Sequence, residues 1–249
     1  MRTAAGRLAL IVGVLGALTL PAAAPAAAAN PSLLGSQVIG HSVRHRPIVA
    51  YHLGSRHGRP VLIVGQMHGD ERAGVTLVNA ILHGSRRVEG VNLWVVPTMN
   101  PDGYAAHTRQ NAHHVDLNRN FPYRWAHLSG QYYSGRRAES EPESRAMAAF
   151  LRHLRPKYVV SLHQPLDGVD TTDGGAVDHA FANRLARGLG LPHRAFRCWS
   201  TCHGSMTGWY THRRYGVAIT VEFGAHPRRA YLVGRAARAI VAALGGRLR

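Results

Sequence analysis

The sequence contains few acidic residues and a single lysine. It is therefore not an acidic protein, and its positive charge comes almost entirely from arginine. Lysine and arginine together number 30 against 13 Asp and Glu, the formal net charge is +17, and the one lysine is Lys157. Arginine-rich composition partly reflects codon usage in a GC-rich genome; beyond that, the charge favours an anionic polymer as partner. The basic residues are scattered rather than interleaved with aromatic residues, so we expect no nucleic-acid partner.

Long hydrophobic runs are confined to the first 29 residues. Arg2 and Arg7 precede an apolar stretch over 8–20, and an alanine-rich run over 22–29 follows, which is the pattern of a secretory signal peptide. The stretch falls short of the about 20 strongly apolar residues of a membrane span, so a signal anchor is less favoured. We therefore expect a secreted or wall-associated protein without a transmembrane segment after signal cleavage. Its mature part is one domain over 30–249, and anionic cell-wall polymers are its natural charged partners.

Cysteine is scarce, and the only two lie close together. Cys198 and Cys202 occur in CWSTC. Outside the cytosol such a pair favours a disulfide, which over so short a loop would fix a local turn rather than stabilise the whole chain. A second metal site is the alternative, but His203 is the only further ligand beside the two thiols.

Strand and helix patterns alternate along the rest of the chain. Short, apolar, β-branched runs predict buried strands over Ile48–Leu53, Pro60–Val64, Val91–Val96, Tyr158–Leu162 and Val217–Val221. Helical periodicity predicts helices over Glu71–His83, Glu141–Leu154, His179–Leu189 and Arg228–Leu244. The sequence therefore predicts an α/β fold with largely parallel central strands. The last helix either docks on the sheet, which we favour, or lies on a membrane surface. The stretch 99–140 has no clear element, and so long a loop is usually functional or disordered.

Polar side chains follow three of the predicted strands. His68 and Glu71 come after the run ending at Val64, His163 directly follows another strand, and Glu222 follows a third. One H-x-x-E pair arises easily by chance in a chain with 17 His. Three strands that each deliver a His or Glu to the same edge are harder to obtain by chance, and sites of α/β sheets form outside these strand ends.

These residues predict a catalytic zinc site for one Zn²⁺ ion. His68, Glu71 and His163 would form a His₂Glu set with a fourth position open for water, and Glu222 would be a general base. No H-E-x-x-H occurs, which excludes the helix-borne metalloprotease arrangement. Alternatively, His163 is an ordinary hydrogen-bonded histidine and Glu222 pairs with an arginine. Four other histidines compete for the third ligand position without directly following a buried strand: His113, His114, His203 and His226.

The middle segment, HTRQNAHHVDLNRNFPYRW, supplies cations. Arg109 or Arg119 could stabilise an anionic tetrahedral intermediate or bind a substrate carboxylate. Asp116 could accept a hydrogen bond from the far nitrogen of a ligand histidine. Taken alone, arginines in a loop are more often solvated than catalytic.

Together these motifs resemble the zinc carboxypeptidase superfamily. The resemblance rests on the H-x-x-E of His68 and Glu71, NPDG at 100–103, DLNRNFP at 116–122, His163 and Glu222. More narrowly, the chain is similar to the bacterial murein peptide amidases over 36–245. This similarity is carried by GHSVRHRPI, TRQNAHHVDLNRNFP, SEPESRA, HQPLDGVD, CHGSMTGWY and TVEFGA.

The resemblance implies a fold and a role for each residue. The fold is an α/β/α sandwich around a mixed, about eight-stranded sheet. His68, Glu71 and His163 would bind zinc. Arg109 would polarise the scissile carbonyl, and Asn118 and Arg119 would bind the substrate carboxylate. Glu222 would act as general base and then as proton donor, and Asp116 would orient His68. Tyr210 would take the place of the mobile tyrosine of the family.

The resemblance also implies a substrate. Murein amidases cleave the bond between γ-D-glutamate and diaminopimelate in peptidoglycan stem peptides. Alternatives are a carboxypeptidase acting on ordinary L-peptides, an N-acyl amino acid deacylase, and a non-catalytic cell-wall-binding protein that would be expected to lack a ligand or the base. Two departures from the family pattern are expected to matter: His113 and His114 could narrow the pocket or alter its charge, and a chain shorter than the digestive enzymes implies a more open site.

Overall fold

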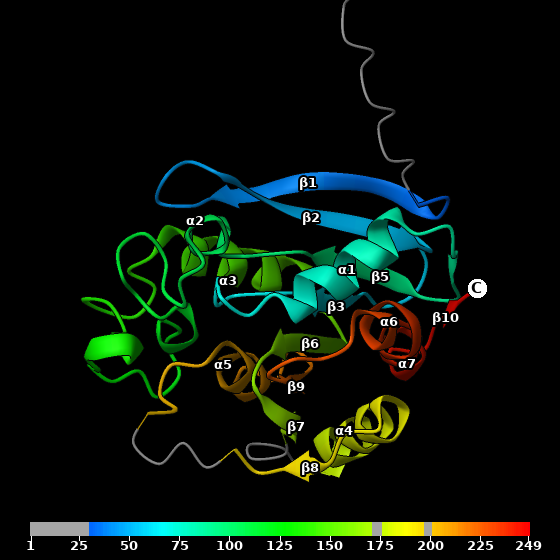
Figure 1. Cartoon of the computed structure of the whole chain (residues 1–249). Coiled ribbons are helices and arrows are strands. Elements are labelled where there is room, and N and C mark those ends of the chain that lie inside the picture. Colours follow the sequence, from blue (N-terminus) through cyan, green and yellow to red (C-terminus); the bar gives the residue numbers. More distant parts are fainter. Residues whose placement is uncertain (1–29, 171–175, 197–200) are drawn as a thin grey trace, which may run out of the picture.

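The computed structural model describes residues 30–170, 176–196 and 201–249 (Figure 1). The predicted leader and Cys198 lie outside these residues, so the signal peptide and the disulfide stay predictions. Eight strands form one sheet in the order β1-β2-β5-β3-β6-β9-β7-β8. Their bounds are β1 Leu33–His41, β2 Pro47–Gly54, β3 Val61–Val64, β5 Asn92–Val96, β6 Tyr158–His163, β7 Leu166–Asp170, β8 His193–Arg194 and β9 Val217–Gly224. A small second sheet pairs β4 (Val88–Glu89) with β10 (Arg247–Leu248).

The centre of the sheet is parallel, as the alternation of strands and helices predicts. β5, β3, β6 and β9 pair in parallel, whereas β2 and β7 join this block antiparallel. The four-residue β3 is entirely buried, which explains its uninterrupted run of Val, Leu, Ile and Val. All five predicted strands are present, and β1, β7 and β8 extend the sheet to the eight strands of the predicted mixed sheet.

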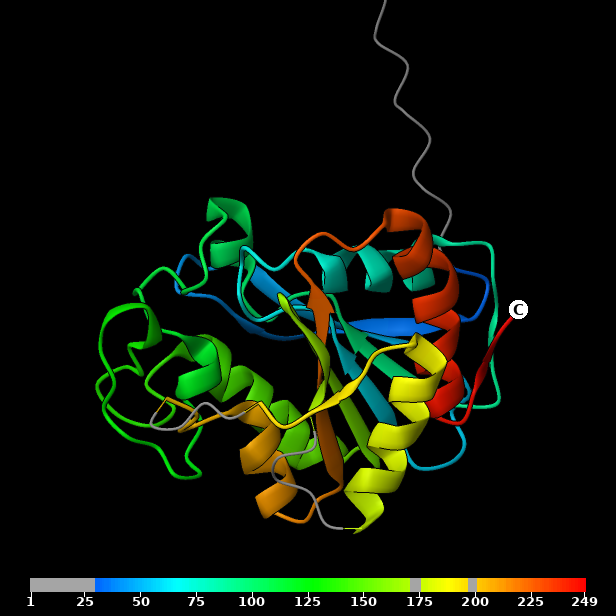
Figure 2. The same ribbon diagram turned by 60° about the horizontal axis from the view of Figure 1, so that its bottom comes forward.

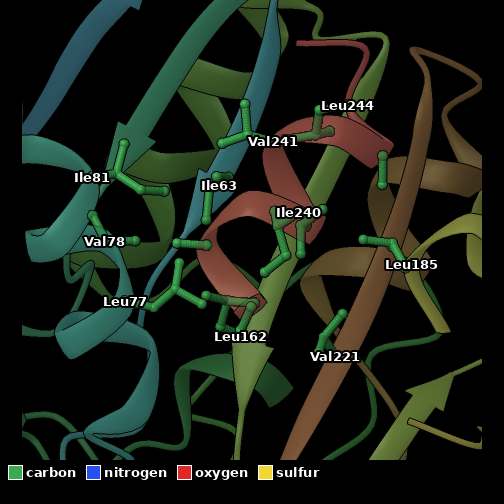
Figure 3. Close-up of a cluster of buried hydrophobic side chains, with 14 of the residues drawn as sticks. Ile63, Leu77, Val78, Ile81, Leu162, Leu185, Val221, Ile240, Val241 and Leu244 are labelled. Carbon is green, nitrogen blue, oxygen red and sulfur yellow. The ribbon is translucent and has the colours of Figure 1, made fainter. Parts of the chain in front are cut away.

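Helices cover both faces of the sheet, which makes an α/β/α sandwich (Figure 2). On one face, α1 (Ala73–His83), α4 (Ala176–Leu189) and α7 (Ala237–Ala243) bury an apolar cluster (Figure 3). On the other, α3 (Pro142–Leu154) and α5 (Met206–His212) cover a second cluster. The remaining short elements are α2 (Pro101–Ala106), η1 (Leu117–Arg119), η2 (Gly130–Tyr132), α6 (Arg229–Tyr231) and the π-helical turn η3 (Leu232–Ala236).

The C-terminal helical segment docks on the sheet, as favoured from its sequence. It consists of α6, η3 and α7 rather than one regular helix. Leu232, Ile240, Val241 and Leu244 are buried in the first apolar cluster. In the described part of the chain, no helix combines the length and the apolar character that crossing a membrane requires.

Candidate active site

The turn after β3 carries two of the predicted zinc ligands. It brings His68 and Glu71 to the carboxyl edge of the sheet, where the backbone N–H of Glu71 donates to the carbonyl of His68 at 3.0 Å. This turn packs tightly: a Cβ on Gly69 would lie 1.9 Å from the backbone of Gly103. Asn100 fixes the same contact, since its side chain donates to the carbonyl of Met67 at 3.0 Å and accepts from the Gly103 N–H at 2.9 Å. The NPDG motif is therefore a support for the ligand turn.

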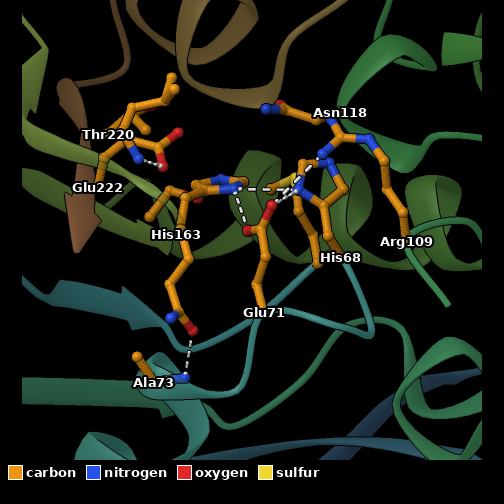
Figure 4. A network of polar contacts seen from close by, with 12 residues as sticks. His68, Glu71, Ala73, Arg109, Asn118, His163, Thr220 and Glu222 are labelled. Atoms are coloured by element: carbon orange, nitrogen blue, oxygen red, sulfur yellow. Dashed lines mark hydrogen bonds and ion pairs between the residues drawn. The ribbon is translucent and has the colours of Figure 1, made fainter. Parts of the chain in front are cut away.

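Three buried side chains converge on one point. His163, the last residue of β6, places Nδ1 3.2 Å from Nδ1 of His68 and 2.9 Å from Oε2 of Glu71. The other carboxylate oxygen of Glu71 lies 2.7 Å from Nδ1 of His68. One candidate ligand atom from each residue falls within 4.8 Å of the others. Figure 4 shows the three side chains pointing toward one another.

The electrostatics of this cluster fit a cation. Burial disfavours the charged imidazolium, but the charges and hydrogen bonds of Glu71 and Asp116 outweigh it and raise the pKa of His68 to about 9. Burial likewise opposes ionisation of Glu71, yet the two histidines hold the pKa of this carboxyl well below its usual range. Two imidazole nitrogens and one carboxylate are the ligand set of catalytic zinc. The residues present therefore fit a single zinc ion.

Asp116 joins the ligand cluster to Arg109. Its Oδ1 lies 3.0 Å from Nε2 of His68 and accepts from the backbone N–H of Asn118 at 2.9 Å. Its Oδ2 accepts from Nε and Nη2 of Arg109 at 3.0 and 2.8 Å. Burial opposes ionisation of this carboxyl, but His68 and Arg109 hold its pKa well below the usual range. Asp116 thus fixes both the tautomer of His68 and the direction of the Arg109 fork.

Arg119 is a buried cation with an unused donor. Its Nε has no hydrogen-bond acceptor among the described residues, whereas Nη1 donates to the carbonyl of Asn118 at 2.9 Å. Burial lowers the pKa of this guanidinium. The ring of Tyr132 contacts both arginines, with its centroid 5.3 Å from Cζ of Arg119 and 5.4 Å from Cζ of Arg109. Buried donors in proteins nearly always have an acceptor, and an anionic group bound in the adjoining cavity would supply one to Arg119.

Glu222 stands beside the ligands on β9. It is the strand partner of His163, and its Oε2 accepts from the backbone N–H of Leu166 at 3.3 Å. Burial raises the pKa of this carboxyl, an effect that His163 partly offsets. In Figure 4, Glu222 and Thr220 lie on one side of the histidines, and Arg109 and Asn118 lie on the other.

A cavity of about 1310 Å³ opens onto these groups. The predicted metal, catalytic and carboxylate-binding residues that line it are His68, Glu71, Arg109, Asn118, Arg119, His163 and Glu222, and Cys202 of the predicted disulfide lines it as well. Asp116 lies beneath it, fully buried. The walls also contain residues with no role predicted from the sequence, among them Tyr123, Arg124, Tyr132, Asp170, Arg194, Thr207 and Thr220. Several of them lie in motifs that carry the family resemblance: Asp170 in HQPLDGVD, Thr207 in CHGSMTGWY and Thr220 in TVEFGA.

The prediction for Tyr210 is wrong. This residue is fully buried on α5, and its hydroxyl donates to the carbonyl of Pro156 at 2.7 Å. It packs in the second apolar cluster with Met206 and Trp209, because the spacing of these residues puts them on one face of α5. Tyr210 therefore cannot contact a substrate.

The expectation that His113 and His114 narrow the pocket is also wrong. Neither residue lines the cavity. Nδ1 of His113 lies 2.8 Å from Oε2 of Glu141, and His114 is an exposed turn residue with φ of 58°. Both side chains belong to the outer surface of the loop.

Comparison with known proteins agrees with this geometry. Residues 23–166 match the zinc carboxypeptidase family. The chain belongs to this family. It is 34% identical to murein peptide amidase A of Vibrio campbellii over 155 residues, which are 57% of this chain and 60% of that protein. Murein peptide amidase A of Escherichia coli K12 is 31% identical over 150 residues, 53% of this chain and 60% of that protein. These alignments span less than two thirds of the length of either relative.

The structural likeness extends further than the sequence alignments. A crystal structure of murein-tripeptide amidase from Escherichia coli O157 superposes with a TM-score of 0.65 and 29% identity, covering 84% of this chain and 91% of that chain. Bovine thrombin-activatable fibrinolysis inhibitor has a TM-score of 0.68 at 19% identity over 86% of this chain, which supports the fold alone. The fold is thus that of a zinc carboxypeptidase, and the His–Glu–His set holds the positions for one zinc ion.

Proposed function

We propose that this zinc hydrolase cleaves peptidoglycan stem peptides at the amide bond between γ-D-glutamate and diaminopimelate. One observation carries the proposal: the buried Arg119, with its unused Nε donor, lines the same cavity as the His–Glu–His set. The amine released from this bond bears a free carboxylate beside the cut, and a guanidinium binds such a group through parallel hydrogen bonds. The likeness to murein-tripeptide amidase supports the same substrate class.

The side chains have complementary roles in this reaction. When bound, zinc supplies a Lewis acid that polarises the scissile carbonyl and lowers the pKa of water. Glu222 accepts the proton of the attacking water and then donates it to the leaving amine, so that the amide bond breaks and a carboxylate forms. Arg109, held by Asp116, directs its remaining donors toward the oxygen on which negative charge develops. Asn118 and Arg119 hold the carboxylate of the leaving amino acid.

Export to the cell wall is part of this proposal. The leader-like first 29 residues and the net charge of +17 support a protein that meets anionic wall polymers outside the cytosol. In that compartment Cys198 and Cys202 would be oxidised. A protease-protection assay on cells that express a tagged full-length chain tests this part, and protection of the tag inside the cytosol would contradict it.

Two substrates distinguish the proposal from its alternatives. The zinc-loaded protein would be incubated with L-Ala-γ-D-Glu-diaminopimelate and, separately, with a blocked L-dipeptide that has a free carboxyl end. We expect mass spectrometry to detect free diaminopimelate with the intact enzyme and none with Glu222→Gln. Cleavage of the dipeptide alone would instead indicate an ordinary carboxypeptidase. Cleavage of neither, with zinc bound, would favour a deacylase or a wall-binding protein.

A further inference from the structure

Arg194 lines the same pocket as Arg119 and has no predicted role. It is the last residue of β8, is exposed, and lines the same cavity as Glu222. Across the three described stretches of the chain, no hydrogen bond or ion pair involves its guanidinium. Arg109, in contrast, is paired with Asp116 at 2.8 Å. Among the described residues, three arginines line the pocket without an ion-pair partner: Arg119, Arg124 and Arg194.

A glycine directs the Arg194 side chain into the pocket. A Cβ on Gly168 would lie 2.9 Å from both Cγ and Cδ of Arg194 and 3.2 Å from its Cβ. The aliphatic stem of Arg194 thus occupies the space above Gly168 that a larger residue would fill. An arginine side chain that extended into solvent would not need a glycine beneath it, so this close contact indicates that the Arg194 stem lies against β7.

The strand register places this stem on the catalytic side of the sheet. Gly168 is the antiparallel partner of Glu222, and paired residues on neighbouring strands point to the same face. The two-residue period of strands puts Asp170 and Thr220 on that face as well. Both line the cavity, and Oγ1 of Thr220 lies 3.3 Å from Oγ1 of Thr207. Arg194, Asp170, Thr207 and Thr220 therefore form a polar end of the pocket, which we call the distal subsite.

The spacing of the strands sets the reach of a ligand. β9 and β7 follow β6 in the sheet, so a guanidinium above β7 is about 10 Å from the strand of His163, at roughly 4.8 Å per step. In the proposed reaction the carboxylate beside the scissile bond is held by Arg119. An anion held by Arg194, above a strand two steps from that of His163, then belongs to a more distant part of the substrate.

We propose that the distal subsite binds the second amino-acid head group of diaminopimelate, with Arg194 holding its carboxylate. This inference rests on the proposed function and names the substrate feature that the site selects. The carboxylate of γ-linked glutamate is a poorer match, because only three carbons separate it from the scissile carbonyl, whereas five separate the distal carboxylate of diaminopimelate from the scissile nitrogen.

Lysine provides a matched substrate, since it differs from diaminopimelate only by lacking the distal carboxylate. Binding of L-Ala-γ-D-Glu-diaminopimelate and L-Ala-γ-D-Glu-L-Lys would be measured by calorimetry on zinc-loaded Glu222→Gln, which removes turnover, with and without Arg194→Ala. We expect Arg194→Ala to weaken binding of the diaminopimelate peptide about 10- to 100-fold and to leave the lysine peptide unchanged. Equal losses for the two peptides, or no loss, would overturn the inference.

Two further variants keep the result interpretable. Gly168→Ala, which displaces the Arg194 stem without removing its charge, is expected to weaken binding of the diaminopimelate peptide selectively. Arg187→Ala removes a charge from an exposed position of α4 that does not line the cavity, so binding should not change. If the effect of Arg194→Ala disappears when the glutamate carboxylate is amidated, Arg194 binds that group instead and the inference is wrong.

The inference and the proposed function can fail separately. If the wild-type enzyme cleaves neither peptide while binding of the diaminopimelate peptide still depends on Arg194, the proposed reaction is wrong and the distal subsite stands. If the wild-type enzyme releases diaminopimelate and lysine with equal kcat/KM, the reaction stands and the distal subsite is overturned.

Discussion

Asp116 accepts two hydrogen bonds from Arg109, at 3.0 Å from Nε and 2.8 Å from Nη2. This paired contact fixes a pocket cation to the same carboxylate that lies 3.0 Å from Nε2 of His68. One buried carboxylate therefore orients both a zinc ligand and the cation beside it, which explains why DLNRN follows Arg109 at this spacing.

Substitution of Asp116 tests this double role. In Asp116→Asn, the side-chain amide can accept from His68 or from Arg109 but not from both. We expect zinc affinity to fall about 10- to 100-fold, as for other partners of metal-bound histidines, and kcat to fall as well. Zinc affinity would be measured by competition with a chromophoric chelator. Unchanged zinc affinity together with unchanged kcat would show that Asp116 orients neither group.

Arg119 is predicted to act through substrate binding. Loss of its charge in Arg119→Ala should raise KM about 10- to 100-fold for a substrate with a free carboxylate beside the cut. Arg119→Lys should recover only part of this loss, because an ammonium cannot make the paired contact. The same substrate with that carboxylate amidated is the control. An equal effect on both substrates would contradict the assigned contact.

Tyr132 is predicted to position both arginines through its ring. The ring lies within 5.4 Å of the two guanidinium carbons, at a distance typical of cation–π contacts. Tyr132→Ala should therefore lower kcat/KM about tenfold, whereas Tyr132→Phe should retain most of the activity because it keeps the ring. Steady-state kinetics of the two variants measure this difference. If Phe is as damaging as Ala, the hydroxyl rather than the ring carries the effect.

Asp102 gives the fold a predictable dependence on pH. It is buried, which alone would raise its pKa, but the Arg44 backbone N–H at 2.9 Å and Nη1 of Arg46 at 2.5 Å hold the pKa of this carboxyl below its usual value. Its contribution to stability is therefore present above the unfolded-state pKa of about 3.9 and is lost as the pH falls through the lower folded-state pKa.

The matching variant is Asp102→Asn. We expect it to lose about 1–3 kcal/mol of unfolding free energy at pH 7, the range for hydrogen bonds to a charged group. The difference from wild type should shrink as the pH falls below 4, since the wild-type carboxyl then becomes neutral as well. Urea denaturation at a series of pH values measures both effects. A constant difference across the acidic range would contradict the assigned ionisation.

The sequence predicted the central strands and the ligand cluster for the same physical reason. Strands buried on both faces must be apolar throughout, so β3 and β6 can be recognised in the sequence as short β-branched runs. A charged or imidazole residue directly after such a run has to lie at the sheet edge. For this reason His163 could be distinguished from the other sixteen histidines of the chain.

Other parts of the fold gave weaker signals. β1 is an edge strand that pairs only with β2 and carries Gly35, Ser36 and Gln37, so it lacks a buried apolar run. α5 has seven residues, too few for periodicity to reveal which face is buried, so no pattern in the sequence indicated that Tyr210 belongs to the core. The position of Arg194 depends on the space above Gly168, which only the register of β7 with β9 reveals.

The most direct test of the account compares the intact enzyme with Glu222→Gln at equal zinc content. Zinc would be quantified by mass spectrometry in both proteins, and release of diaminopimelate from L-Ala-γ-D-Glu-diaminopimelate would be followed over time. The account predicts one zinc per chain in each protein and diaminopimelate release by the intact enzyme alone. Release at the same rate by Glu222→Gln, or no release by an intact enzyme that holds its zinc, would contradict it.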